Sequence, residues 1–209
     1  MHNRDLFWGF EAKEKEELLR LLDAKEEQYK KGDIVIAPTE VLKSFAIVKK
    51  GSVSAYQLDS EGKEVLLSVI QSGGCLATSL AFLGVPSPVT VIASEDSTVL
   101  WLNVSPLREN NENGLVRRLF LNFALLMAED VLKMNERIRV ITQPNIKKKL
   151  MGFLELYQKI PGEEFTVPMD RAAMAAYIGA DRSALSRVIS GLQSEKRINC
   201  VKNRFQILY

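Results

Sequence analysis

One stretch of the sequence, from Leu115 to Thr142, contains neither Gly nor Pro. As an unbroken helix it would extend roughly 40 Å at about 1.5 Å per residue, which is longer than a small domain is wide. Its apolar positions recur mostly three and four residues apart, so we expect the helix to pair with a second copy of itself. The alternative is that this stripe packs on the helix's own domain. The predicted dimer seam comprises Val116, Leu119, Phe120, Phe123, Leu126, Met127 and Met134.

The segment before this helix favours β-structure. A short amphipathic helix over residues 11–22 comes first. From Gln28 to Leu102, β-branched and aromatic runs alternate with Gly, Pro and Asp turn signals, which is typical of a small antiparallel barrel or sandwich. We expect a second helix to begin at Ser105 and Pro106, with Ser105 as the cap and Pro106 in the first helical position. The expected strands are residues 34–36, 45–48, 53–58, 64–70, 89–93 and 98–102, with a turn over 59–63.

The segment after the long helix predicts a helix-turn-helix. Residues 142–145 break the long helix and form a candidate hinge, and another helix follows over 146–159. The stretch 169–192 then predicts two helices, the first ending at Gly179 and the second capped by Asp181. Apolar residues form the inward stripe of both helices. The outward side chains near the start of the second helix are Arg182, Ser183, Ser186 and Arg187, which are suited to base edges and phosphates.

The C-terminal residues complete a winged helix and carry excess positive charge. Residues 198–201 and 204–208 predict a hairpin with Lys202 and Arg204 near its tip. Residues 145–209 contain 11 Lys/Arg against 6 Asp/Glu, a charge of +5, whereas residues 1–144 carry −3. A basic C-terminal third indicates contact with a polyanion, and double-stranded DNA is the expected partner.

The composition excludes several classes of protein. The chain has 209 residues, of which 46% are hydrophobic and 26% charged, as in a folded globular protein. No run reaches the roughly 20 apolar residues of a membrane helix, and the N-terminus lacks the apolar core of a signal peptide, so we expect a cytoplasmic protein without membrane contact. The two cysteines and single histidine, His2, are too few for a four-cysteine site or an internal histidine base. We therefore expect no catalytic residues, no metal site and no enzymatic activity.

The sequence resembles the CRP/FNR family of bacterial transcription regulators over almost its whole length. The residues 45–53 and 59–67 resemble the family's β-roll with its Gly turns, and 73–82 take the place of its phosphate-binding cassette. Ser186 and Arg187 match the family's Ser-Arg pair, and Arg187 is where the family places a guanine-reading arginine. Arg182 matches an arginine of the cyclic-AMP receptor branch, whereas Ser183 replaces the usual glutamate, so we expect a different operator half-site.

The resemblance implies an α+β fold in three parts. Residues 1–104 would form an effector-sensing antiparallel β-roll, a cupin-like jelly roll of the cyclic-nucleotide-binding type. Residues 105–143 would form a helical connector with the long dimerisation helix, and residues 144–209 a winged helix. The implied protein is a homodimer that reads a two-fold symmetric operator, with RNA polymerase as a further candidate partner.

The cassette departs from the cyclic-AMP-binding members of the family. Their ribose-binding glutamate and phosphate-binding arginine align with Thr78 and Ser87, and Ala77 replaces a glycine. Loss of the guanidinium removes a charge-assisted contact of roughly 1.5–3 kcal/mol, so cyclic AMP is not the expected effector. The chain also lacks the cysteines of the iron–sulfur branch and a haem-ligating histidine in the roll, and neither cofactor is expected.

The sequence does not identify the effector. One candidate is an unidentified small molecule between the roll and the long helix, in a pocket placed by family geometry from Gly73, Cys75, Thr78, Ser79, Ser87, Phe123 and Met127. The alternatives are a collapsed pocket in a protein active without ligand, and a redox switch at Cys75. At the level of function, the alternative to a DNA-binding regulator is a ligand-binding module whose winged helix mediates protein contacts.

Overall fold

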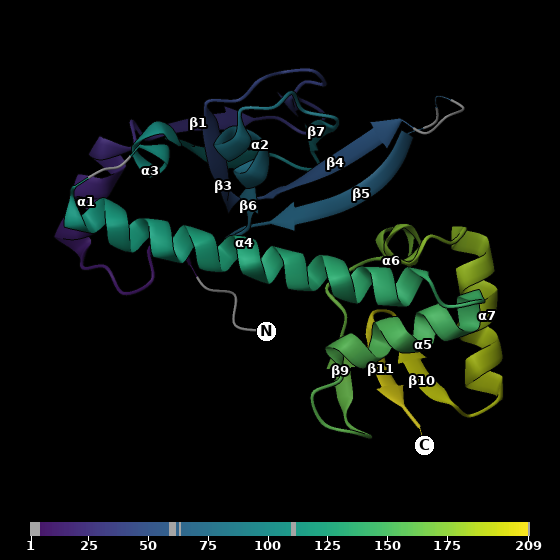
Figure 1. The fold of residues 1–209 in the computed structure, drawn as a ribbon. Coiled ribbons are helices and arrows are strands. Elements are labelled where there is room, and N and C mark those ends of the chain that lie inside the picture. Colours follow the sequence, from purple (N-terminus) through teal and green to yellow (C-terminus); the bar gives the residue numbers. More distant parts are fainter. Residues whose placement is uncertain (1–4, 59–61, 63, 110–111, 209) are drawn as a thin grey trace. The chain divides into compact units, whose positions relative to one another are not determined.

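The computed structural model describes residues 5–58, 62, 64–109 and 112–208. The chain divides into two compact units, Met1–Val131 and Leu132–Tyr209, and each is described by itself. The first holds an antiparallel β-roll and most of a long helix, and the second holds the helix-turn-helix and a small sheet (Figure 1). The predicted α+β fold is confirmed. The predicted helical connector is shared between the two units, because Val140 near its C-terminal end packs in the second core.

The β-roll consists of two four-stranded antiparallel sheets whose facing sides form the core of the first unit. Phe45, Val48, Val53 and Val99 from these strands are fully buried. Gly51 makes the tight β3–β4 connection at φ 80°, and a Cβ there would lie 2.4 Å from Ser97 Oγ. One sheet has the order β1-β8-β3-β6, made of β1 (Lys25–Tyr29), β8 (Ser97–Asn103), β3 (Ser44–Lys50) and β6 (Cys75–Leu76). The other has the order β2-β7-β4-β5, made of β2 (Ile34–Ile36), β7 (Thr90–Ala93), β4 (Ser52–Leu58) and β5 (Glu64–Gln71).

Three short helices accompany the roll. Helix α1 (Ala12–Leu21) begins with a capping box between Glu11 and Glu14 and buries Leu18 in the core. Helix α2 (Thr78–Leu83) lies within the cassette segment. Helix α3 (Ser105–Arg108) differs by one position from the prediction, because Val104 is its N-cap, so Ser105 and Pro106 are already helical.

The long helix α4 (Gly114–Ile141) has the predicted length. Part of the apolar stripe that was expected to pair with a second copy packs on the β-roll instead. Val116, Leu119 and Phe123 are buried in the core of the roll, and Leu126 and Met127 pack against that core. Val116, Leu119 and Phe123 therefore pack on the helix's own domain, which was the alternative to a dimer seam, and their assignment to the seam is corrected. For the half-buried Leu126 and Met127 the assignment stays a prediction. Phe120 and Met134 remain exposed. A second apolar stripe lies on the opposite side of α4 and comprises the exposed residues Leu121, Leu125, Ala128 and Leu132.

The second unit is a winged helix, as predicted. Helix α5 (Ile146–Tyr157) is capped by Asn145, whose side chain accepts from the backbone N–H of Lys148. The core of this second unit contains Phe153, Ile178, Leu185 and Phe205, all nearly inaccessible to solvent. The remaining elements are α6 (Arg171–Ile178), α7 (Arg182–Ser194) and a sheet of order β10-β11-β9, made of β10 (Ile198–Val201), β11 (Arg204–Ile207) and β9 (Glu164–Thr166).

Candidate nucleic-acid interface and effector region

Two residues, Gly179 and Asp181, fix the turn of the helix-turn-helix. Gly179 ends α6 in the left-handed region at φ 62°, ψ 52°. Asp181 caps α7: its Oδ1 accepts from the backbone N–H of Ser183 at 2.8 Å and of Ala184 at 3.1 Å, and from Ser183 Oγ at 2.6 Å. These hydrogen bonds and the nearby positive charge of Arg187 lower the pKa of Asp181 from its usual value. The carboxylate thus fixes the direction in which α7 starts.

The four residues predicted to face DNA lie together on the exposed side of α7. Arg182, Ser183, Ser186 and Arg187 are all exposed, while Leu185 and Ile189 on the other side are buried. Neither arginine has an ion pair with any carboxylate among the described residues. Ser186 Oγ donates to the backbone oxygen of Arg182 at 3.0 Å. Two guanidinium groups on this face that form no ion pair among the described residues can donate to phosphate oxygens or to the acceptors of guanine.

The wing presents the two remaining predicted residues. Lys202 and Arg204 are exposed in and after the tight β10–β11 turn, where Lys202 has φ 55°. Arg171 at the start of α6 holds this turn: its Nη2 donates to Cys200 Sγ at 2.8 Å and to the Lys202 backbone oxygen at 2.7 Å. Its guanidinium lies 5.1 Å from the ring centre of Phe205. The side chain of Arg171 therefore connects the wing to the first helix of the helix-turn-helix.

Two arginines that orient these surfaces were not predicted from the sequence. Besides Arg171, Arg137 near the end of α4 donates from Nε to the backbone oxygen of Tyr177 at 3.1 Å and from Nη2 to that of Ala176 at 3.3 Å. A cation at the C-terminus of α6 complements the carbonyl groups there. No local pattern predicts these contacts, since the partners lie about 30 to 40 positions apart in the sequence.

The residues predicted for the effector pocket lie in different surroundings. Phe123 is a core residue, with its ring edge-on to Phe45 at 5.1 Å and tilted against Phe82 at 5.6 Å. Its place in a pocket lining stays a prediction. Met127 packs against the same core. Cys75 is half-buried in β6, pairs with Ile47 of β3, and forms no disulfide.

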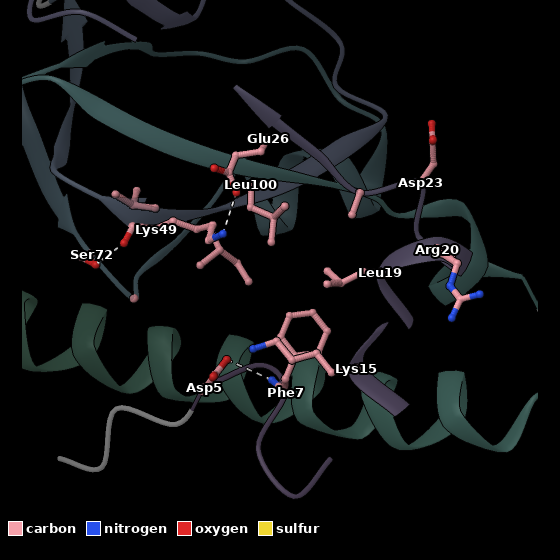
Figure 2. A pocket seen from close by; sticks show the side chains of 14 residues that line it. Asp5, Phe7, Lys15, Leu19, Arg20, Asp23, Glu26, Lys49, Ser72 and Leu100 are labelled. Atoms are coloured by element: carbon pink, nitrogen blue, oxygen red, sulfur yellow. Dashed lines mark hydrogen bonds and ion pairs between the residues drawn. The ribbon is translucent and has the colours of Figure 1, made fainter. Parts of the chain in front are cut away.

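The cassette residues 73–82 carry no charged side chain, and the two residues aligned with the ligand-binding glutamate and arginine, Thr78 and Ser87, are buried. Ser87 is 2% exposed, and its Oγ donates to the Val89 backbone oxygen at 2.9 Å. Thr78 is buried, whereas Ser79 is exposed. Ala77 precedes α2 in the left-handed region at φ 59°, ψ 15°, where the resemblance places a glycine. Among the predicted pocket residues, only Gly73 lines the large cleft of this unit, a space of about 820 Å³ beside α1 (Figure 2).

Neither a metal site nor a membrane-spanning helix is found in the part of the chain that the structure describes. Within residues 5–58, 62, 64–109 and 112–208, no three His, Cys, Asp or Glu side chains are grouped so that they could hold a metal ion. In the same ranges, no helix combines the length and apolar character needed to span a bilayer.

Comparison with known proteins assigns both units. A cyclic nucleotide-binding domain model matches residues 26–109, and a Crp-like helix-turn-helix domain model matches residues 148–209. Together they cover well over half of the chain. The comparison with curated proteins found no matching sequence.

Solved structures share the fold over most of their length. FixK2 from Bradyrhizobium japonicum is 18% identical, with 89% of this chain and 93% of that one covered and a TM-score of 0.65. The c-di-GMP-responsive global regulator CLP from Xanthomonas campestris is 15% identical, with 95% and 100% covered and a TM-score of 0.69. A CooA mutant from Carboxydothermus hydrogenoformans is 21% identical, with 91% and 90% covered and a TM-score of 0.66. With a cyclic nucleotide-binding domain followed by a Crp-like helix-turn-helix, the chain belongs to the CRP/FNR family of transcription regulators.

Proposed function

We propose that this protein is a homodimeric regulator that recognises a two-fold symmetric DNA operator and responds to a small molecule other than cyclic AMP. The observation that carries the proposal is the exposed face of α7, where Arg182 and Arg187 lie beside Ser183 and Ser186 with no carboxylate paired to either arginine among the described residues. Unpaired cations on the surface of a recognition helix favour a polyanionic partner, and their bidentate geometry suits guanine.

The wing supplies the second contact in this proposal. Lys202 and Arg204 are exposed at the end of a hairpin that Arg171 fixes to α6. Side chains at such a tip reach phosphates rather than base edges, so they add affinity without discriminating between sequences. In this division of roles, α7 determines which sequence is bound and the wing strengthens binding to any sequence.

The exposed stripe of α4 supports the homodimer. Leu121, Leu125, Ala128 and Leu132 follow one another at spacings of four, three and four residues, the period of a two-stranded coiled coil. Leu121 is 63% exposed and Leu132 57% exposed in the single chain, a large apolar surface to leave in water. Pairing along this stripe would bury it. It would also supply the two recognition helices that a symmetric operator requires.

The cassette argues against cyclic AMP as the effector. Ser87 offers no positive charge to a cyclic phosphate, and its hydroxyl is already bonded to the backbone of Val89. Displacing that bond would leave a buried polar group without its partner. We therefore infer a different small-molecule effector, which acts by favouring one setting of the segment 142–145 that follows α4. The protein would act in the cytoplasm, where it meets DNA and, as an activator, RNA polymerase.

Selection of bound duplexes from a random DNA pool tests this function. The purified protein is used with and without a small-molecule extract of the source cells. Recovery of a two-fold symmetric motif is the expected result, and its dependence on the extract would demonstrate an effector. Absence of enrichment under both conditions would contradict the proposal and favour a module whose winged helix contacts proteins.

A further inference from the structure

A cleft of about 820 Å³ lies on the outer side of the β1-β8-β3-β6 sheet, where α1 and the N-terminal segment approach it (Figure 2). Cross-strand pairing places Glu26, Leu100 and Ile47 in one row on this face of the sheet. Leu19 of α1 and Phe7 add further apolar surface. The volume lies within the range of about 300–1,000 Å³ that is usual for small-molecule sites.

Two of the three carboxylates that line the cleft have lysine partners. Glu26 Oε2 lies 2.6 Å from Lys49 Nζ, an ion pair visible in Figure 2. The carboxylate of Asp23 pairs with Lys25 at 2.8 Å. Asp5 Oδ1 accepts from the backbone N–H of Phe7 at 3.1 Å. Lysine side chains thus pair with Asp23 and Glu26, whereas the Asp5 carboxylate accepts one backbone N–H.

The two cations that α1 contributes to the cleft, Lys15 and Arg20, contact a ring and a backbone oxygen. Lys15 Nζ lies 5.0 Å from the ring centre of Phe7, and Arg20 Nε donates to the Glu16 backbone oxygen at 3.4 Å. Neither is within ion-pair distance of a carboxylate among the described residues. An apolar floor therefore adjoins an ammonium and a guanidinium for which the described part of the chain supplies no ion-pair partner.

We propose that this cleft binds a small organic anion with an apolar body and one acidic group. The apolar body would lie on Ile47, Leu100 and Leu19, and the carboxylate or sulfonate would meet Lys15, with Arg20 at the rim. An acidic group would gain a charge-assisted contact there that a neutral molecule of the same shape lacks. This site is separate from the cassette residues Thr78 and Ser87, and it does not rest on DNA binding.

Fluorescence titration of the full chain without DNA tests the site with two probes that differ in one charged group. 8-Anilinonaphthalene-1-sulfonate carries a sulfonate, and N-phenyl-1-naphthylamine is its neutral counterpart. We expect saturable binding of the sulfonate with one site per chain, and clearly weaker binding of the neutral probe. The double variant Lys15→Gln, Arg20→Gln should weaken sulfonate binding about tenfold or more, the order expected for loss of a charge-assisted contact.

Lys13→Gln provides the matched control, because Lys13 is exposed on the same helix but does not line the cleft. Its affinity for the sulfonate should stay at the value of the unsubstituted protein. Equal affinity for both probes, or unchanged sulfonate binding in the double variant, would overturn the proposal. Absence of saturable sulfonate binding would do the same. None of these results bears on the DNA selection described above.

Discussion

Ala77 occupies a backbone conformation that suits glycine better than alanine. It lies at φ 59°, ψ 15° directly before α2, in the left-handed region where a Cβ crowds the backbone. The residue therefore carries a local conformational cost that the rest of the roll offsets. This conformational cost falls in the segment where, by resemblance to the family, the backbone would approach a ligand closely.

Replacing Ala77 with Gly should relieve this cost. We expect the free energy of unfolding to rise by about 1 kcal/mol, since Gly adopts this conformation without steric penalty. Urea unfolding of Ala77→Gly against the unsubstituted protein measures the change. Ala81→Gly is the matched control: Ala81 is helical and fully buried in the same α2, so this variant should be less stable by about 1 kcal/mol or more. Equal destabilisation by both variants would contradict the account of Ala77.

Asp181 makes the start of α7 sensitive to acid. Its pKa is lowered in the folded protein by hydrogen bonds from Ser183 and Ala184 and by the charge of Arg187. A carboxyl group with a lowered folded pKa stabilises the fold above its unfolded value of about 3.8, and this stabilisation is lost as pH falls through the folded value. Asp181→Asn keeps an oxygen at the cap but removes the charge.

We therefore expect Asp181→Asn to be less stable than the unsubstituted protein at neutral pH, with the difference shrinking as the solution is acidified below the ordinary carboxyl range. Urea unfolding of both proteins at a series of pH values provides the measurement. A difference that stays constant across the series would show that charge at this cap plays no part.

At the scale of elements, α4 shows why a helix with two apolar faces is hard to interpret from its sequence. Both stripes have spacings of three and four residues, so periodicity alone cannot say which one the roll covers. The structure buries the stripe containing Leu119 and Phe123 and exposes the stripe containing Leu121 and Leu132. Which stripe is buried depends on contacts with strand and helix residues such as Phe45 and Phe82, which are distant in the sequence.

The exposed stripe gives a direct prediction for self-association. Leu132→Glu places a charge in the proposed seam, where burial without a partner is strongly unfavourable, so the dimer should dissociate to monomer. Sedimentation velocity at matched concentrations would measure the change. Lys133→Glu introduces the same side chain one residue away, about 100° around the helix, and should leave the dimer intact. A dimer that persists in Leu132→Glu would place the seam elsewhere.

The helix-turn-helix was predictable because its boundaries depend on local chemistry. Gly179 and Asp181 end one helix and start the next through contacts within four residues, and the sequence shows both. Strand β1 was largely missed, since Lys25–Tyr29 is mostly polar and exposed and becomes a strand only through pairing with β8. Helix α2 was missed because six residues next to glycines show too little periodicity. The predicted turn over 59–63 falls almost entirely outside the described residues.

The whole molecule combines a β-roll unit with a basic winged-helix unit, and the cleft beside α1 illustrates the limit of prediction at this scale. Phe7, Leu19, Ile47 and Leu100 come from four separate segments, and no pattern along the chain links them. The charge asymmetry, in contrast, is visible in the sequence because it needs only a count. Residues 145–209 carry +5, which predicts affinity for DNA that falls as salt is added.

Lys202 should contribute to that salt dependence without affecting sequence choice. It is exposed in the wing turn, on a backbone that Arg171 holds through the Lys202 oxygen. Lys202→Ala should weaken binding to cognate and unrelated duplexes alike and reduce the slope of log affinity against log salt by about 1. Fluorescence anisotropy across a salt series provides the test. A loss confined to the cognate duplex would instead make Lys202 a sequence-reading residue.

The measurement that tests the central claim most directly is a paired selection from a random duplex pool with the unsubstituted protein and with Arg187→Ala. The account predicts that the unsubstituted protein enriches two inverted half-sites about one DNA turn, roughly 34 Å, apart. Arg187→Ala should lose about 1–3 kcal/mol on that site and relax the preference at one base pair in each half-site, leaving the others intact. Uniform weakening on all sequences, or no symmetric motif with the unsubstituted protein, would contradict it.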